Sequence, residues 1–220
     1  MKKDKEILTI ERIRAAHRSR RKEIQSRLAE FESIRNAGRN ERLWEEMVFC
    51  FFTGGCSARM GLNAVNAVRH LLMEGTQEQL AAALSGVHRY PNARSRYIVH
   101  SRNFLRAHCG LELGEKLKGF RDHHERRDWL VKEKGIKGLG YKEASHFLRN
   151  IGFRGYAILD KHILRSLAEL RIIDEPKPPN TRTAYLTIEE KLKHLTRVLR
   201  IDFDELDLVL WSMKTGVILK

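Results

Sequence analysis

The chain has 220 residues, of which 42 are lysine or arginine and 28 are aspartate or glutamate, so its formal net charge is +14 at pH 7. A content of 42% hydrophobic and 32% charged residues is typical of a globular protein and excludes an intrinsically disordered chain. A basic surplus of this size favours a polyanionic partner, most often nucleic acid. A generally basic surface without such a ligand is the alternative at this point.

The cysteines are Cys50, Cys56 and Cys109, and no two of them form a Cys-x-x-Cys pair. Their number excludes a four-thiolate zinc or iron–sulfur site within one chain, and their spacing disfavours a disulfide framework. The charged amino-terminal segment differs from a signal peptide, and no apolar run is long enough to cross a bilayer. We therefore expect a cytoplasmic monomer that binds neither a membrane, a metal nor a cofactor.

Apolar residues recur at helical spacing along the chain, whereas strand-like alternation is almost absent. The segment 76–86 opens with Thr76 and Gln79, which have the spacing of a capping box, and it stops at Gly86. We expect an all-α protein of about ten helices. The apolar stripes that predict them contain Ile24 and Leu28, Trp44 and Val48, Tyr97 and Ile98, Phe147 and Leu148, Ile163 and Leu164, Ile188 and Leu192, and Leu206 and Val209.

Basic residues are concentrated in three segments, residues 17–22, 89–96 and 134–142. A single concentration of this kind is more often a solvated surface than a binding site. The second and third segments gain weight because each leads into a predicted helix. At such a place backbone N–H groups and side-chain cations can bind the same phosphate.

A glycine hairpin, Gly138-Leu139-Gly140, connects the helix predicted around residues 129–134 with the one that starts near Tyr141. Glycine permits a positive φ and close backbone approach, and we expect Leu139 to be buried. The loop amides would then face outward at a helix N-terminus, which is a favourable place for phosphate. In a chain with a charge of +14 this pattern favours DNA-backbone binding over an ordinary helix–helix corner.

Lys142 stands at the start of the helix that follows the hairpin. The positive end of the helix dipole and cations such as Lys137 destabilise its ammonium form, which favours a neutral amine. A neutral lysine amine is a nucleophile that forms Schiff bases with sugar or carbonyl carbons. The alternative is a charged lysine that binds phosphate, and the hairpin alone does not decide between them.

Asp160 lies eighteen residues after Lys142, between an apolar stretch and a predicted helix. An aspartate in this position commonly caps the helix N-terminus. A carboxylate on a rigid helix start can also stabilise positive charge that develops on a sugar ring. Both roles are compatible with the sequence.

The segments "IKGLGYKEA" and "ILDKHILR" resemble the helix-hairpin-helix DNA glycosylases of base excision repair, the superfamily that includes endonuclease III. This resemblance implies that Lys142 attacks C1′ of a damaged nucleotide and that Asp160, in an Asp-x-His stretch, assists. The segment "RYPNARSR" is similar to one that precedes the hairpin in these proteins. The residues that the resemblance assigns to the DNA backbone are Lys137, Gly138, Gly140, His162 and Arg94.

A narrower resemblance links "GYKEASHFLRN", "AILDKHILR" and "LWSMKTGVILK" to the second type of 8-oxoguanine DNA glycosylase/AP lyase, found in archaea and some thermophilic bacteria. It implies a nucleoid-associated enzyme that excises 8-oxoguanine from double-stranded DNA and nicks the strand by β-elimination. Trp211 and Lys220 would then recognise the oxidised base. A glycosylase for another oxidised base and a non-catalytic helix-hairpin-helix DNA-binding module are the alternatives.

The resemblance runs from about residue 41 to the end of the chain, with two departures. Lys137 replaces the usual hairpin proline, and Gly55 stands where many relatives place a glutamine that fills the gap left by the flipped base. The resemblance implies two helical subdomains with the active site in the cleft between them. We expect one of them to comprise residues 1–43 and 165–220, and the other residues 44–164, with the helix-hairpin-helix at about 126–151.

The end of the chain is unusually apolar for a terminus. We expect the last helix to end near Lys214 and Gly216 to turn the chain. Val217, Ile218 and Leu219 would then be buried and would hold Lys220 near the base pocket. A tail that only packs against the core is the alternative.

Overall fold

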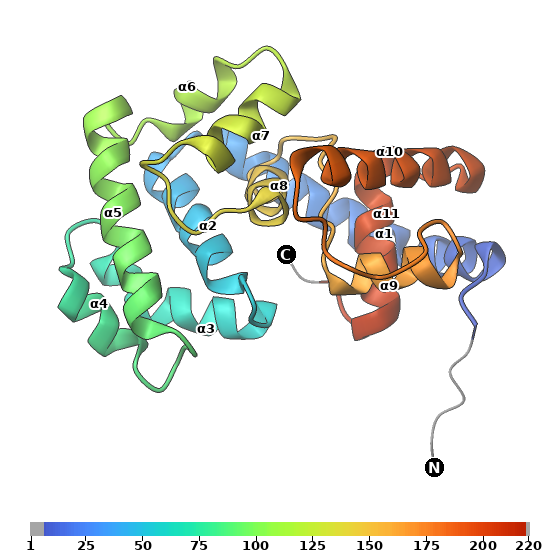
Figure 1. The fold of residues 1–220 in the computed structure, drawn as a ribbon, viewed down its shortest axis with the longest axis horizontal. Coiled ribbons are helices and arrows are strands. Elements are labelled where there is room, and N and C mark those ends of the chain that lie inside the picture. Colours follow the sequence, from blue (N-terminus) through green and yellow to red (C-terminus); the bar gives the residue numbers. More distant parts are fainter. Residues whose placement is uncertain (1–6, 219–220) are drawn as a thin grey trace. The chain divides into compact units, whose positions relative to one another are not determined.

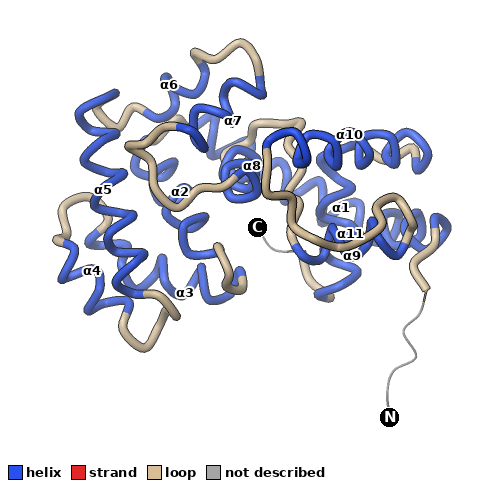
Figure 2. Tube along the Cα trace, in the orientation of Figure 1, coloured by secondary structure: helices blue, strands red, loops and turns tan. Residues whose placement is uncertain are grey.

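The computed structural model describes residues 7–218, and all regular structure within that range is helical (Figure 2). The predicted all-α class is confirmed. No helix in this range is both long and apolar enough to span a bilayer. The elements are α1 (Ile10–Ala37), α2 (Asn40–Thr53), α3 (Ala58–Val68), the 3-10 helix η1 (Arg69–Leu71), α4 (Gln77–Leu84), α5 (Pro91–Cys109), α6 (Leu113–Lys118), α7 (His123–Lys132), α8 (Tyr141–Asn150), α9 (Lys161–Glu169), α10 (Arg182–Leu199) and α11 (Phe203–Thr215).

Side-chain caps define several helix starts, as the sequence predicts. Thr76 and Gln79 form a complete capping box at α4, in which each side chain accepts a hydrogen bond from the other residue's backbone N–H. The Asp122 side chain caps α7 by accepting hydrogen bonds from the backbone N–H groups of His124 and Glu125. The adjacent residues His123 and His124 therefore lie in the first turn of α7.

The chain divides into two compact units. Unit 1 combines the two ends of the chain, up to Ala29 and from Arg154 onward, and unit 2 comprises Glu30–Phe153. In Figure 1, α2–α8 belong to unit 2, and α9–α11, with the first part of α1, belong to unit 1.

The expected boundaries followed residues 43 and 164, whereas the observed units meet after Ala29 and after Phe153. The packing of α1 explains the first difference. The end of α1 packs within unit 2, where the Arg149 guanidinium lies 5.1 Å from the Phe31 ring centroid. Gly152, just after α8, approaches the backbone of Glu32 so closely that an added Cβ would lie 2.7 Å from its Cα. One continuous helix thus contributes to both units, a feature that apolar periodicity does not reveal.

Helix α2 is the centre of the core of unit 2. Its second half, Met47–Phe52, is apolar on all sides, Leu43, Trp44 and Phe52 are fully buried, and the helix packs against α3, α5, α6 and α8. A helix that is apolar all round belongs in a protein interior. The indole N–H of Trp44 donates to the Leu72 carbonyl at 3.1 Å, so its polar atom is also satisfied.

Unit 1 has its own core, formed by the first part of α1 with α9, α10 and α11. Ile13, Ile24, Leu164 and Val209 are fully buried there. The core continues to the N-terminal end of α11, where the Asp204 carboxylate accepts a 2.9 Å hydrogen bond from the Gly155 N–H. Each unit therefore has a rigid frame on which functional side chains can be held.

Candidate active site

The glycine hairpin of unit 2 is fixed against α5. Gly138 has a φ of +85°, and a Cβ added there would lie 2.5 Å from Cδ2 of Tyr97, so only glycine fits. The Lys137 N–H donates to the Ser101 hydroxyl at 2.9 Å, and Leu139 is buried as predicted. The Lys137 side chain is exposed. The hairpin is therefore a rigid loop with a cation on its outer side.

Lys142 lies in the first turn of α8, whose N-cap is Gly140. Because glycine has no side chain, it leaves the first amides of the helix without a side-chain cap, as a site for an anionic ligand requires. The Lys142 side chain is 24% exposed, and its Nζ lies 3.4 Å from Oε1 of Glu143, whose side chain is 18% exposed. The amine is thus accessible but has a carboxylate beside it.

Glu143 was not singled out from the sequence. Neighbouring residues on a helix do not normally face each other, so its position next to Lys142 gives only a weak signal. The structure shows the contact because Glu143 turns back toward the hairpin. Its carboxylate also lies near Gly54, where an added Cβ would be 3.7 Å from Oε1 of Glu143.

Arg94, expected at the DNA backbone, makes its described contacts within unit 2. Its Nη2 donates to the Gly54 carbonyl after α2, and its guanidinium lies 5.6 and 5.4 Å from the ring centroids of Tyr90 and Tyr97. A cation at this place stabilises the carbonyl end of α2. Arg94 therefore links α2 and α5 beside the hairpin, and a DNA contact stays a prediction. Gly55, which follows Gly54 and stands where many relatives have a glutamine, is exposed with a φ of +76°.

In unit 1, two side chains of α10 position the extended segment that leads to Asp160. The Tyr185 hydroxyl donates to the Ala157 carbonyl at 2.7 Å and accepts from the Leu159 N–H at 3.4 Å. The buried Glu189 carboxylate accepts from the Ala157 N–H at 3.0 Å. These contacts fix the chain just before Asp160.

Asp160 is the N-cap of α9. Its Oδ1 accepts hydrogen bonds from the N–H groups of His162, at 2.8 Å, and Ile163, at 2.9 Å. None of the residues 7–218 donates to Oδ2, and the side chain is half-buried. One oxygen therefore caps the helix, and the other is available for a ligand.

His162 and Trp211 lie together beside Asp160. Their ring centroids are 6.4 Å apart and their planes are nearly perpendicular, at 86°. Burial holds the pKa of His162 below its usual range; Asp160 opposes this shift, whereas the neighbouring cations, Lys214 among them, add to it. The His162 ring is therefore harder to protonate than that of a solvent-exposed histidine.

The end of the chain agrees only in part with the prediction. Helix α11 ends at Thr215, and Gly216 turns the chain with a φ of +84°. Ile218 is 3% exposed, whereas Val217 is 45% exposed, so the prediction that Val217 is buried was wrong. Successive residues of a short non-helical segment face opposite sides, and only one of the two can reach the core. Leu219 and Lys220 lie outside the described residues.

The expected site residues fall into two sets. Unit 2 holds Lys142 with Lys137, Gly138, Gly140 and Arg94, around the hairpin. Unit 1 holds Asp160, His162 and Trp211 at the start of α9 and on α11. Within each set the structure brings together residues that are distant in the sequence.

Known proteins resemble this chain over most of its length. The family described as 8-oxoguanine DNA glycosylase matches residues 24–201. An 8-oxoguanine DNA glycosylase/AP lyase of Korarchaeum cryptofilum is 41% identical over 198 residues, which is 90% of each chain. One of Fusobacterium nucleatum is 39% identical over the full length of both chains.

Two solved structures also match over nearly their whole length. The Methanocaldococcus jannaschii 8-oxoguanine glycosylase/lyase, in complex with a 15mer DNA containing 8-oxoguanine, has a TM-score of 0.87 and 34% identity; the match covers 96% of this chain and 99% of that one. The 8-oxoguanine DNA glycosylase of Thermotoga maritima has a TM-score of 0.86 and 32% identity, with coverage of 96% and 98%. The similarity thus includes both units.

Proposed function

Because the chain belongs to the 8-oxoguanine DNA glycosylase family, we propose that it excises 8-oxoguanine from double-stranded DNA and then cleaves the strand through a Schiff base on Lys142. The observation that carries this proposal is the position of Lys142. Its amine lies in the first turn of α8, directly after a hairpin that α5 holds rigid. Glycosylase and lyase activities agree with the names of the relatives.

The hairpin supplies the contact with the DNA backbone. Gly140 leaves the first N–H groups of α8 open, and the exposed Lys137 adds a positive charge beside them. A phosphate at this position would accept hydrogen bonds from the amides and lie at the positive end of the helix. Binding there brings the sugar of a neighbouring nucleotide toward Lys142.

A base inside a duplex is out of reach, so the damaged nucleotide must rotate out of the stack. The Lys142 amine attacks C1′ once it has lost a proton, a C–N bond forms, and the N-glycosidic bond breaks as the base leaves with the bonding electrons and takes up a proton. The Glu143 carboxylate, 3.4 Å from Nζ, is placed to accept the proton that the amine loses. The sugar ring then opens to a protonated imine. Loss of a C2′ proton expels the 3′ phosphate and nicks the strand.

Asp160 is proposed to stabilise the positive charge that develops on the sugar as the glycosidic bond breaks. Its Oδ1 caps α9, which leaves Oδ2 to face the sugar. The hydrogen bonds of Tyr185 and Glu189 to the preceding segment hold this carboxylate in place. A charged group that is fixed before the reaction needs no reorganisation in the transition state.

Recognition of the base requires a hydrogen-bond acceptor, because 8-oxoguanine carries an N7–H where guanine has an acceptor. Trp211, which is half-buried next to His162, offers a face on which the rotated base can stack. With Trp211, we assign Lys220 to recognition of the oxidised base. The proposed enzyme acts as a monomer in the cytoplasm, associated with the nucleoid.

The test is a single-turnover assay on duplexes that contain 8-oxoguanine, guanine or an oxidised pyrimidine, with borohydride present to trap a Schiff base. We expect trapping and nicking on the 8-oxoguanine duplex, and Lys142→Gln to abolish both while duplex binding persists. The matched control is Lys137→Gln, which changes an exposed lysine of the same hairpin. It should weaken duplex binding and still be trapped.

Two outcomes would contradict the proposal. Preferential trapping on the oxidised pyrimidine would make the chain a glycosylase for another lesion. Tight duplex binding without release of any base would make it a non-catalytic helix-hairpin-helix module, with Lys142 as a phosphate ligand.

A further inference from the structure

Helix α1 carries a basic face. Arg14, His17, Arg18 and Arg21 occur at positions i, i+3, i+4 and i+7, the spacing that an apolar face would normally have. They include most of the basic segment 17–22, to which the proposed chemistry gives no role. The buried residues of this helix, Ile13 among them, occupy a different stripe.

This face of α1 lines a cavity of about 340 Å³ in unit 1, which we call the basic cavity. Its other walls are Leu199–Asp202, where α10 ends and α11 begins, and Glu205 in the first turn of α11. Arg200 adds a further guanidinium. The lining therefore contains four arginines and a histidine against two carboxylates.

Three members of the basic cavity already have partners within the protein. Arg14 donates to the carbonyls of Leu199, at 3.3 Å, and Val198, at 2.8 Å, and so caps the end of α10. His17 Nε2 lies 2.6 Å from the carboxylate of Glu205. Both oxygens of Glu205 are thus engaged within the protein, because Gln25 also donates to its Oε1 at 3.0 Å.

Arg18, Arg21 and Arg200 remain. Among residues 7–218 none of the three side chains has a hydrogen bond or ion pair, and Arg18 and Arg21 are exposed. The only remaining carboxylate of the lining is Asp202, which caps α11 by accepting from the Asp204 N–H at 2.9 Å. Three free guanidiniums therefore outnumber one engaged carboxylate.

The backbone of Arg200 gives independent support. It is the C-cap of α10 with a φ of +56°, a left-handed conformation that favours glycine. An arginine at this position is less stable than a glycine would be, so Arg200→Gly can remove the guanidinium without destabilising the fold. Arg171 has a similar φ of +57° but lies outside the cavity lining, which makes it a suitable control.

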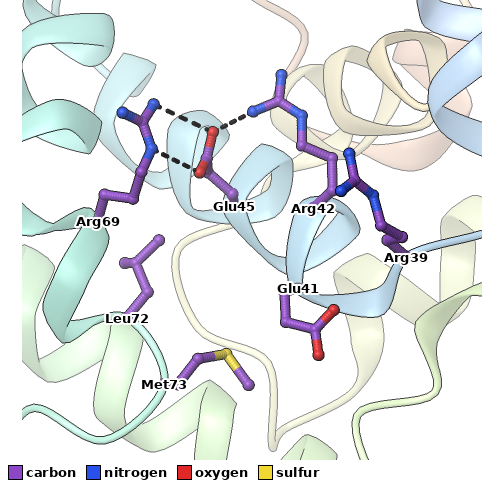
Figure 3. A pocket seen from close by; sticks show the side chains of 7 residues that line it. All are labelled: Arg39, Glu41, Arg42, Glu45, Arg69, Leu72 and Met73. Atoms are coloured by element: carbon purple, nitrogen blue, oxygen red, sulfur yellow. Dashed lines mark hydrogen bonds and ion pairs between the residues drawn. The ribbon is translucent and has the colours of Figure 1, made fainter.

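A cavity in unit 2 provides a contrast (Figure 3). It is lined by Arg39, Arg42 and Arg69 among others, but Glu45 lies at its centre and binds both Arg42 and Arg69. Those two guanidiniums are neutralised within the protein. Arg18, Arg21 and Arg200 of the basic cavity have no such partner among residues 7–218 and are left for an external anion.

We propose that the basic cavity binds a phosphate of the DNA backbone, in addition to the contact made by the hairpin. The proposal rests on the proposed function, because it takes double-stranded DNA to be the partner. Guanidinium groups form paired hydrogen bonds with phosphate oxygens, and a cavity lined by three unpaired ones suits that ligand.

The experiment measures the affinity for an undamaged duplex by fluorescence anisotropy at several salt concentrations. The test variant is Arg18→Ala with Arg21→Ala, since neither side chain has a described partner whose loss would affect folding. The control is Lys22→Ala with Arg171→Gly. It also removes two positive charges, but from exposed positions outside the cavity lining. Each variant is also assayed for cleavage of an 8-oxoguanine duplex at saturating protein.

We expect the test variant to bind about tenfold more weakly near 0.1 M salt and to lower the slope of log Kd against log salt by about one, the value for one lost phosphate contact. The control should change affinity less than twofold. Equal changes in the two variants, or none in either, would overturn the proposal. Arg200→Gly should reproduce the loss without reducing the melting temperature.

Two further results separate this proposal from others. If inorganic phosphate at millimolar concentration raises the melting temperature through Arg18 and Arg21 while duplex affinity is unchanged in the test variant, the cavity binds a small anion and the proposal fails. If the test variant loses duplex affinity as expected but the unmodified protein does not cleave 8-oxoguanine DNA, the cavity proposal holds and the proposed function fails.

Discussion

At the scale of a single residue, we propose that the Asp160 carboxylate has two tasks. Oδ1 caps the N-terminus of α9, and Oδ2 would stabilise the positive charge of the transition state. Since asparagine also caps helices well, Asp160→Asn separates the two tasks. We expect the single-turnover rate to fall by at least about 100-fold, and the melting temperature to stay nearly unchanged. Stopped assays and thermal unfolding measure these quantities.

Asp122→Asn is the matched control, because the Asp122 Oδ1 also accepts from two backbone N–H groups at the start of a helix. This substitution should leave the cleavage rate unchanged. If Asp160→Asn lost activity only in proportion to its loss of stability, Asp160 would be a cap and nothing more.

His88 is a second residue whose environment has a measurable consequence. Its Nε2 bonds to the Phe52 carbonyl at 3.0 Å, and its Nδ1 accepts from the Tyr90 N–H at 3.0 Å, so the neutral ring satisfies both groups. Burial lowers the pKa of His88; the bond to the Phe52 carbonyl opposes the shift, and Arg94 adds to it. Protonation would break the bond to Tyr90 at the start of α5.

The sign of the pH dependence follows from that lowered pKa. In the unfolded chain a histidine takes up a proton below about pH 6.5, whereas folded His88 resists protonation until a lower pH. The free energy of unfolding should therefore fall as the pH decreases from about 6.5 through the folded-state pKa. Urea unfolding at pH 7.5 and 5.0 tests this, with His88→Asn as the comparison. If both proteins lost the same free energy of unfolding on acidification, this role of His88 would be contradicted. A smaller pH dependence is expected to remain in the variant, because the pKa of His162 is also lowered.

At the scale of elements, the hairpin depends on one glycine for two reasons that can be separated. Gly138 needs a positive φ, and it also needs the space that Tyr97 leaves. Gly138→Ala should lower the free energy of unfolding by about 2–4 kcal/mol, through the backbone strain and the clash together. It should also weaken duplex binding, because the hairpin must shift. Denaturant unfolding and anisotropy measure the two effects.

Gly86→Ala isolates the backbone contribution. Gly86 lies in the same unit with a φ of +72°, but an added Cβ would meet no atom within 4 Å. The expected loss is about 1 kcal/mol, with duplex binding intact. Equal losses at the two glycines would show that the contact with Tyr97 contributes little.

Local signals in the sequence predict most of what is local in the structure. The capping box at Thr76, the helix stop at Gly216 and the buried Leu139 all follow from residue types at short spacing. The fit of Gly138 against Tyr97 and the support of the segment before Asp160 by Tyr185 join residues far apart in the chain. Periodicity carries no information on such contacts.

The sequence also does not predict which groups the charged side chains contact. The resemblance implies a DNA contact for Arg94, which stays a prediction, but not the hydrogen bond from its guanidinium to the Gly54 carbonyl at the end of α2. Glu143 was overlooked because adjacent helical residues seldom meet, yet it contacts the proposed nucleophile. In both cases the rotamer of a long side chain decides which group it contacts, and only packing fixes the rotamer.

At the scale of the whole molecule, positive charge is placed in both units. Unit 2 has the hairpin with Lys137 and Lys142, and unit 1 has the basic cavity. A net charge of +14 favours binding to DNA of any sequence, which lets the protein search a duplex before it meets a lesion. Because of this basic surplus, lysine amines other than that of Lys142 can also come close to bound DNA. Trapping alone therefore does not identify the nucleophile.

Mapping the trapped adduct tests the central claim most directly. The protein is reacted with an 8-oxoguanine duplex in the presence of borohydride, the DNA and protein are digested, and mass spectrometry locates the sugar remnant. The account predicts a single major adduct, on the Nζ of Lys142. A major adduct on another lysine or on the terminal amine, with Lys142 unmodified, would contradict it.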